Sequence, residues 1–192
     1  MKRSILTLFC LSLFLVVVSS HAQTAPSATK STFSLSAGGM GSVFHPDIWY
    51  DASGNPNSGD SPNRLYGVGA YVDVHFNRWA QIEAEGRWLR FNQYKATSSS
   101  IGNNESNYEI GPRIAPYTFH RFTPYGKVLV GMGEGDFLQT GRCFTLNFGG
   151  GVDYRLSKRF TLRAFDFEYQ RWRVVPTLYP YGGSVGLSYK IF

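Results

Sequence analysis

Apolar and polar residues alternate along the chain from Phe33 to its last residue. In the clearest stretch, residues 65–76, Val72 and Val74 alternate with Asp73. A period of two places successive side chains on opposite faces of a β-strand. The pattern predicts strands at residues 33–44, 65–76, 80–91, 108–117, 123–134, 144–156, 160–172 and 181–192.

The polar face of these strands carries many charges. Residues 80–91 alone place Glu83, Glu85 and Arg87 on one face, opposite Ile82. A barrel in a bilayer must be apolar outside, whereas its lumen can be polar. The pattern therefore predicts an all-β fold, an eight-stranded antiparallel up-and-down transmembrane β-barrel over residues 33–192. A soluble lipocalin-like barrel is disfavoured, because these charges would fill its ligand cavity.

Short and long connections alternate between the predicted strands. The short ones are residues 77–79, 118–122 and 157–159, and the long ones are 45–64, 92–104, 134–143 and 171–180. Outer-membrane barrels have short periplasmic turns and longer extracellular loops. Aromatic residues near the strand ends, including Phe44 and Trp172, are expected at the two membrane interfaces.

The seventh predicted strand does not keep one phase. Leu162 and Ala164 share a face with Asp166 and Glu168. Either a β-bulge near Ala164, or Arg163 extending to the membrane edge, would restore the alternation.

The N-terminus has the pattern of an export signal. A basic start and an apolar run from Ile5 to Val18 precede the small-x-small sequence Ser20-His21-Ala22. We expect residues 1–22 to be a cleaved signal peptide and residues 23–32 a short periplasmic segment. A retained N-terminal anchor is the alternative. The predicted location is the cell outer membrane of a Gram-negative bacterium, reached by export through the periplasm.

Composition narrows the functional classes. The formal net charge is +6, but the cations are scattered among carboxylates, which argues against nucleic-acid binding. Beyond the predicted signal, Cys143 is the only cysteine, so no internal disulfide is possible. No His or Cys cluster has metal-ligand spacing, and we expect no metal and no cofactor.

The chain resembles the OmpA/OmpX-type small outer-membrane barrels. The resemblance rests on the overall pattern, on the stretches 125–131 and 149–156, and on the terminal Phe192. It implies that Phe192 is part of the signal read by the barrel-assembly machinery, although the alternation around Ile191 is one residue out of phase with it. We expect the other partner to be outer-membrane lipid and the protein to be a monomer.

Charges on the predicted inner faces form the candidate functional site. These residues are Asp73, Glu83, Glu85, Arg87, Glu109, Arg113, Lys127, Asp153, Arg155, Asp166 and Glu168. An eight-stranded barrel is only wide enough for its own side chains, so a paired and packed lumen is favoured over a selective pore. The expected role is structural or surface interaction through the loops, whose partner the sequence does not indicate.

Two other functions stay open as alternatives. One is a narrow channel. The other is a lipid-modifying enzyme, for which His45 and Ser42 are the only suitably placed pair. No acid partner or family motif accompanies them, and we expect no enzymatic activity.

Overall fold

A computed structural model describes residues 33–50, 56–58, 64–77, 79–92, 104–135 and 141–192. These residues belong to one compact unit, Thr32–Phe192. The predicted signal peptide and the segment 23–32 lie outside the described residues. None of the described segments is a helix long and apolar enough to span a membrane.

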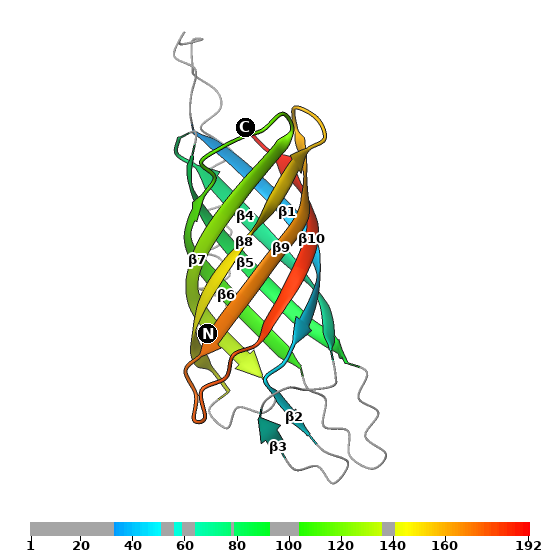
Figure 1. Cartoon of the computed structure of the whole chain (residues 1–192), viewed down its shortest axis with the longest axis vertical. Helices are drawn as coiled ribbons and strands as arrows, with labels where there is room; N and C mark the ends of the chain where they lie inside the picture. Colours follow the sequence, from blue (N-terminus) through cyan, green and yellow to red (C-terminus); the bar gives the residue numbers. More distant parts are fainter. Residues whose placement is uncertain (1–32, 51–55, 59–63, 78, 93–103, 136–140) are drawn as a thin grey trace, which may run out of the picture. The chain divides into compact units, whose positions relative to one another are not determined.

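Eight strands form a closed barrel (Figure 1). They are β1 (Ser34–His45), β4 (Leu65–His75), β5 (Ala80–Asn92), β6 (Glu105–Ile114), β7 (Phe122–Gly135), β8 (Cys143–Arg155), β9 (Phe160–Trp172) and β10 (Tyr181–Lys190). Each barrel strand pairs antiparallel with its neighbours, and β10 closes the ring against β1. The predicted up-and-down antiparallel barrel is confirmed.

The first long connection contains a feature that the pattern did not reveal. Strands β2 (Ile48–Tyr50) and β3 (Pro56–Ser58) pair there as a separate two-stranded sheet. The three short turns lie at one end of the barrel and the long connections at the other (Figure 1). We call these the short-turn end and the long-connection end.

Strand β6 differs most from its prediction. It begins at Glu105 and ends at Ile114, rather than spanning residues 108–117. Its first three residues, Glu105, Ser106 and Asn107, are all polar, so their sequence resembles that of a loop. In the structure all three are buried.

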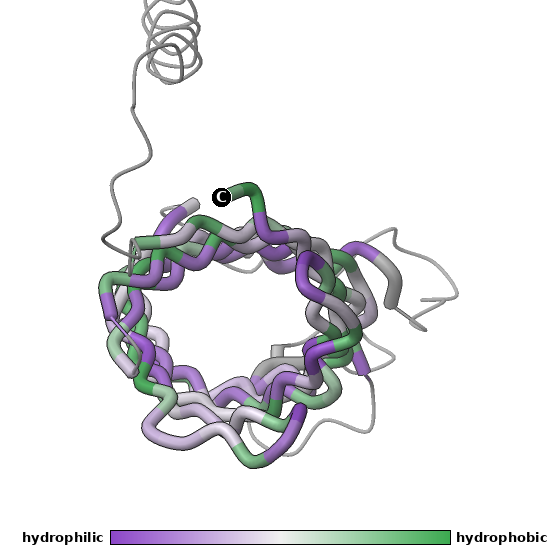
Figure 2. The backbone as a smooth tube through the Cα atoms, turned by 90° about the horizontal axis from the view of Figure 1, so that it is seen from above, coloured by the Kyte–Doolittle hydropathy of each residue, from purple (hydrophilic) through white to green (hydrophobic). Residues whose placement is uncertain are grey.

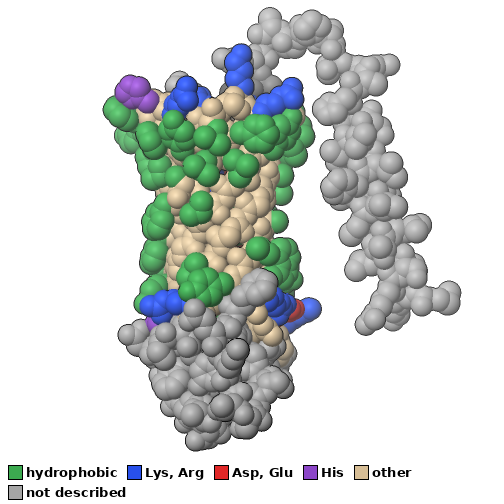
Figure 3. Space-filling view, turned by 90° about the vertical axis from the view of Figure 1, so that its right-hand side faces the viewer, with side chains coloured by type: hydrophobic (Ala, Val, Ile, Leu, Met, Phe, Trp, Pro, Cys, Tyr) green, Lys and Arg blue, Asp and Glu red, His purple; other side chains and the backbone are tan. Residues whose placement is uncertain are grey.

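Side chains alternate between the interior and the outer wall as predicted. Val68, Ile110 and Val130 are exposed on the outside, whereas Tyr71 and Leu129 are buried inside. Viewed along the barrel, the backbone forms a ring (Figure 2). The buried side chains of its strands point into the interior of this ring. On the face that Figure 3 shows, hydrophobic side chains form a dense band near the short-turn end and line the sides of the wall, and Lys and Arg side chains gather at its two ends.

A β-bulge in β9 resolves the broken phase of that strand. Phe165 pairs with Val152 and Arg163 with Asp153, so Ala164 has no partner on β8. The register shifts at the same place on the side of β10. Ala164 and Phe165 are both exposed, whereas the Arg163 side chain is fully buried. The bulge near Ala164 is confirmed, and Arg163 does not extend to the membrane edge.

Two aromatic residues do not belong to the membrane interfaces. Phe44 is 1% exposed and packs inside with Leu65 and Leu89, and Trp172 is 1% exposed and packs with Cys143. The prediction that placed them at the lipid interface is wrong, because both occupy inward positions of their strands. Phe144, Tyr169, Tyr181, Phe122 and Phe160 are exposed on the wall as expected.

The assignment of faces can be tested on adjacent residues of β7. Val130 faces outward and Leu129 inward. An arginine at Val130 would face the hydrocarbon, so Val130→Arg is expected to destabilise the barrel by about 2–4 kcal/mol. Leu129→Gln places a polar amide among other polar lumen groups and should cost less. Urea titration of folding into lipid vesicles measures both, and the reverse order would contradict the assignment.

Candidate functional site

Lys127 on β7 lies at the centre of the charged interior. Its ammonium group donates to Glu83 Oε1 at 2.8 Å and Glu85 Oε2 at 3.0 Å on β5. It also donates to Asp166 Oδ2 at 2.8 Å and Glu168 Oε1 at 2.7 Å on β9. The Lys127 side chain has no exposed surface. One cation therefore joins three alternate strands of the barrel.

Arg87 extends this network towards the long-connection end. Its guanidinium donates to both oxygens of Glu168, at 2.7 and 2.8 Å, and to Glu85 at 3.1 Å. Its Nε donates to Ser42 Oγ on β1 at 3.2 Å. The same guanidinium lies 4.5 Å from the centre of the Phe44 ring. The planar guanidinium of arginine presents two parallel N–H groups, which suits such bidentate pairing with a carboxylate.

Two further arginines form the half of the network at the short-turn end. Arg163 on β9 donates to Glu83 on β5 at 2.6 Å, and Arg113 on β6 donates to Glu83 at 3.2 Å. Arg113 also contacts Asp73 at 3.0 Å and forms a short hydrogen bond to Asp153.

Aromatic rings cover these two guanidiniums. The Arg113 guanidinium lies 3.6 Å from the centre of the Tyr125 ring. The Arg163 guanidinium lies 3.7 Å from the centre of the Tyr71 ring. Cation–π contacts are strongest where water is excluded, as at these buried positions.

Sequence reasoning missed Arg163 as a member of this network. In a regular strand Arg163 and Asp166 would lie on opposite faces, because they are three residues apart. The bulge at Ala164 and Phe165 inserts an extra residue, so the side chains of Arg163 and Asp166 both point inward. The broken phase of the sequence pattern was the only signal of this arrangement.

The structure places most of the predicted lumen residues inside the barrel. Asp73, Glu83, Glu85, Arg87, Glu109, Arg113, Lys127, Asp166 and Glu168 are buried there. Asp153 lies nearer the short-turn end, with 18% of its side chain exposed.

The assignment of Arg155 to the network is wrong. It is the last residue of β8, where the interior opens to solvent, and its side chain is exposed and donates to the His120 carbonyl at 3.4 Å.

Strand β6 carries two buried carboxylates that have no basic group within 4.0 Å among the described residues. Glu109 accepts a hydrogen bond from Asn147 Nδ2 at 2.8 Å, and the same amide donates to Glu168 at 2.6 Å. Glu105 is 3% exposed and was not recognised from the sequence, because it lies before the predicted start of this strand.

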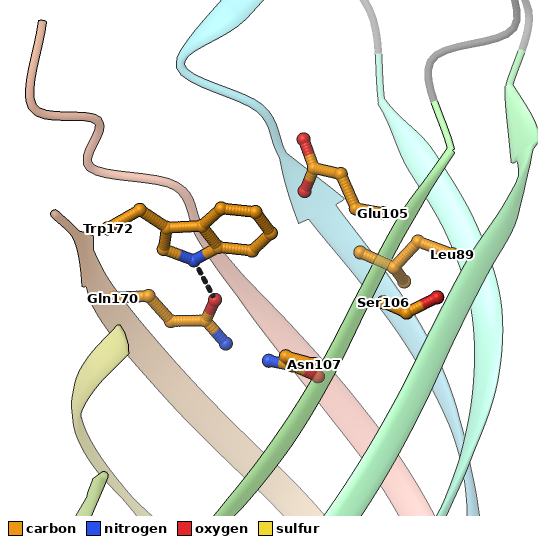
Figure 4. A pocket seen from close by; sticks show the side chains of 6 residues that line it. All are labelled: Leu89, Glu105, Ser106, Asn107, Gln170 and Trp172. Atoms are coloured by element: carbon orange, nitrogen blue, oxygen red, sulfur yellow. Dashed lines mark hydrogen bonds between the residues drawn. The ribbon is translucent and has the colours of Figure 1, made fainter. Parts of the chain in front are cut away.

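The interior becomes more apolar towards the long-connection end. Phe44, Leu65 and Leu89 form one buried cluster, and Cys143, Trp172 and Leu178 form another. Between them lies a narrow gap with no room for a water molecule, lined by Leu89, Glu105, Ser106, Asn107, Gln170 and Trp172 (Figure 4). The Trp172 indole N–H donates to Gln170 Oε1 at 2.9 Å.

The structure gives the two residues of the candidate catalytic pair, Ser42 and His45, different partners. Ser42 is buried, lies 2.8 Å from the Ser184 hydroxyl and accepts a hydrogen bond from Arg87. His45 Nδ1 accepts a short hydrogen bond from Arg64, and its ring lies 4.8 Å from that of Tyr181.

Phe192 lies beside the first strand at the short-turn end. Its carbonyl accepts a hydrogen bond from Leu35 N at 3.2 Å, and its ring stacks on Phe33 with centroids 5.8 Å apart. The terminal residue thus continues the pairing of β10 with β1, although β10 itself ends at Lys190. Its predicted role in assembly stays a prediction.

The sequence of residues 10–190 matches the outer membrane protein beta-barrel domain. The chain belongs to this family. Membership covers nearly the whole chain and places the protein in the outer membrane. No protein of curated function matches the chain.

Solved structures of small outer-membrane barrels are similar to this protein in fold. Neisserial surface protein A, from Neisseria, is 12% identical with a TM-score of 0.53, and the match covers 83% of this chain and 97% of that one. Ail, the attachment invasion locus protein of Yersinia pestis, is 13% identical with a TM-score of 0.49, covering 82% and 99%.

Arginines 163 and 155 offer a matched test of the interior network. Arg163→Met removes a fully buried partner of Glu83 and Asp166, and breaking buried ion pairs by removing one partner should cost about 3–5 kcal/mol. Arg155→Met changes an exposed side chain and should stay within about 0.5 kcal/mol of wild type. Equal effects in urea titrations would contradict the placement of Arg163.

Proposed function

We propose that this outer-membrane barrel is a closed scaffold that does not conduct ions and presents its long connections at the cell surface. The carrying observation is the Lys127 ammonium group with its four carboxylate contacts of 2.7–3.0 Å, which lies across the middle of the interior. Side chains alone fill the lumen of an eight-stranded barrel.

Energetics support a closed interior. An ion crossing this level has to separate Lys127 or Arg87 from Glu168, both pairs being 2.7 Å apart and buried. Separating a buried pair leaves charges without partners, at a cost of several kcal/mol. Between this level and the long-connection end, the apolar clusters around Phe44 and Trp172 form a second barrier.

The arrangement of connections supports a role at the surface. A rigid barrel with short turns at one end and long connections at the other is the form in which loops carry recognition. On this proposal the protein is exported through the periplasm, is inserted by the barrel-assembly machinery with Phe192 as part of the signal, and works as a monomer in outer-membrane lipid.

The proposal includes no enzymatic step. A serine nucleophile needs a base within hydrogen-bond reach and a free approach for substrate. The Ser42 hydroxyl instead contacts Ser184 and Arg87 inside the barrel.

Single-channel recording tests whether the interior is closed. The purified protein in planar bilayers should show no steady conductance steps, because the network centred on Lys127 fills the lumen. A porin in the same bilayer serves as the positive control. Persistent steps of uniform size would overturn the closed barrel and favour a narrow channel.

Cysteine labelling on intact cells tests which end faces outward. Val175 lies in a long connection and Lys158 in a short turn, and both are exposed. A membrane-impermeant maleimide should label Val175→Cys but not Lys158→Cys, whereas both should react after the outer membrane is permeabilised. The native Cys143 is buried, and a Cys143→Ser background removes its contribution. Labelling of Lys158→Cys alone on intact cells would reverse the proposed orientation.

A further inference from the structure

Acidic groups outnumber basic groups in the described interior. Eight carboxylates lie there, those of Asp73, Glu83, Glu85, Glu105, Glu109, Asp153, Asp166 and Glu168, against the four basic groups of Arg87, Arg113, Lys127 and Arg163. A barrel interior of low dielectric disfavours such an excess of one sign unless something compensates it.

The uncompensated acids are concentrated on one strand. Six of the eight carboxylates have a basic group within 4.0 Å. Among the described residues the two without one are Glu105 and Glu109, both on the inner face of β6. The excess charge therefore lies in the half of the interior nearer the long-connection end.

Several buried oxygen atoms lie on the strands around Glu109. The Thr145 hydroxyl faces the Glu109 carboxylate, and the amide oxygens of Asn107 and Asn147 accept no hydrogen bond from the described residues. Asn107, Thr145 and Asn147 are at least 96% buried, so water outside the barrel does not satisfy them. Two unpaired amide oxygens beside a buried carboxylate and a hydroxyl indicate a bound group that accepts electron pairs from oxygen.

Strand pairing places these residues on neighbouring strands at similar levels of the barrel. Glu109 pairs with Gly131, and Gly131 pairs with Thr145, so the acid and the hydroxyl flank a position that has no side chain. One step further along, Asn107 pairs with Gly133. A Cβ at Gly133 would lie 2.9 Å from both the Thr145 methyl and the Trp172 ring, so the side chains of β8 and β9 extend over β7 here.

Two groups of three carboxylates in the interior have oxygens within 4.8 Å of one another: Glu83, Glu85 and Asp166, and Glu85, Glu109 and Glu168. Lys127 Nζ is within 3.0 Å of all three acids of the first group, which therefore needs no further ion. In the second group Lys127 contacts Glu85 and Glu168, and Glu109 is the member that it does not contact.

We propose that the oxygens of Glu109, Asn107, Thr145 and Asn147 bind a calcium-class cation inside the barrel. All four are hard oxygen donors of the carboxylate, amide and hydroxyl kinds, and Ca²⁺ accepts such ligands in flexible geometry at about 2.3–2.6 Å. Mg²⁺ loses its water shell reluctantly and needs near-octahedral geometry, which suits this tightly packed site less well. Zn²⁺ would prefer nitrogen or sulfur ligands.

The narrow gap at the mouth lies next to this site. Asn107 lines it together with Glu105, Gln170 and Trp172 (Figure 4). Strand β6 begins at Glu105, after a long connection, so this gap is on the side of Glu109 nearer the long-connection end. Glu105 is the second carboxylate without a basic partner, and it would attract a cation towards Asn107. Binding here requires no passage through the barrel, so the inference does not depend on conductance.

Terbium luminescence tests the site. Tb³⁺ substitutes for Ca²⁺, and Trp172 on β9, which pairs with Thr145, can sensitise its emission. Protein refolded from urea into detergent micelles with Tb³⁺ should give saturable emission on tryptophan excitation. Excess Ca²⁺ should abolish this emission, and an equal excess of Mg²⁺ should affect it much less.

Variants identify the ligands. Glu109→Gln keeps the shape but removes the charge, and should weaken Tb³⁺ binding at least tenfold, whereas Thr145→Val should weaken it severalfold. The control Glu134→Gln alters a carboxylate that pairs with Arg142 at the barrel end and should bind as wild type. The gel shift between unboiled and boiled samples shows which variants fold. If Glu109→Gln does not fold, the Tb³⁺ affinity of Thr145→Val provides the test.

Three results would overturn the inference. They are no saturable emission from folded wild-type protein, unchanged binding by folded Glu109→Gln or Thr145→Val, and equal competition by Mg²⁺ and Ca²⁺. The first would mean that protons or water compensate the excess acid. A conducting barrel that still bound Tb³⁺ would refute the closed scaffold but leave this site intact.

Discussion

The contact of one lysine with four carboxylates constrains the whole barrel. Strands β5 and β9 lie opposite each other in the ring of eight, and Lys127 on β7 reaches acids on both. Arg87 and Arg163 complete the connection, because each joins an acid on the strand across the interior. The barrel can therefore be no wider than these side chains reach. Because barrel diameter grows with the number of strands, contacts across the interior require a small ring, and a ring of eight strands leaves room only for side chains.

This network also helps to select the register of the strands. Sliding a strand by one residue turns every inward side chain outward. In β5 that slip would expose Glu83, Glu85 and Arg87 to lipid and bring Ile82 inside, at a cost in lipid that no water can offset. Buried ion pairs are weak evidence of stability, since apolar residues of similar shape can replace them. Their stronger effect here is on register, because a slipped strand would separate Lys127, Arg87, Arg113 and Arg163 from the carboxylates that they contact.

The sequence was sufficient for the fold because the bilayer imposes a simple rule. Outward positions must be apolar, so strands such as β4 and β7 are visible from alternation alone, and the connection lengths order them. Strand β6 was harder to locate, since its first inward residues, Glu105 and Asn107, are polar like a loop. The mouth residues Phe44 and Trp172 were misplaced for a related reason. An aromatic residue near a strand end suits either the lipid interface or an apolar seal inside, and only the phase of the strand distinguishes them.

The interior was predictable in composition but not in its connections. Alternation indicated which charges turn inward, yet pairing across the barrel depends on which strands face each other, and that information is absent from any single strand. Arg163 shows the limit most clearly. A regular strand places it on the lipid face, and the unpaired Ala164 brings it inside, where Glu83, Asp73 and Asp166 lie within 3.5 Å of it. The acids in its surroundings supply the reason for the bulge: the strand gives up one ladder position at Ala164, and in return a guanidinium that would be costly in lipid compensates carboxylates that would be costly without it.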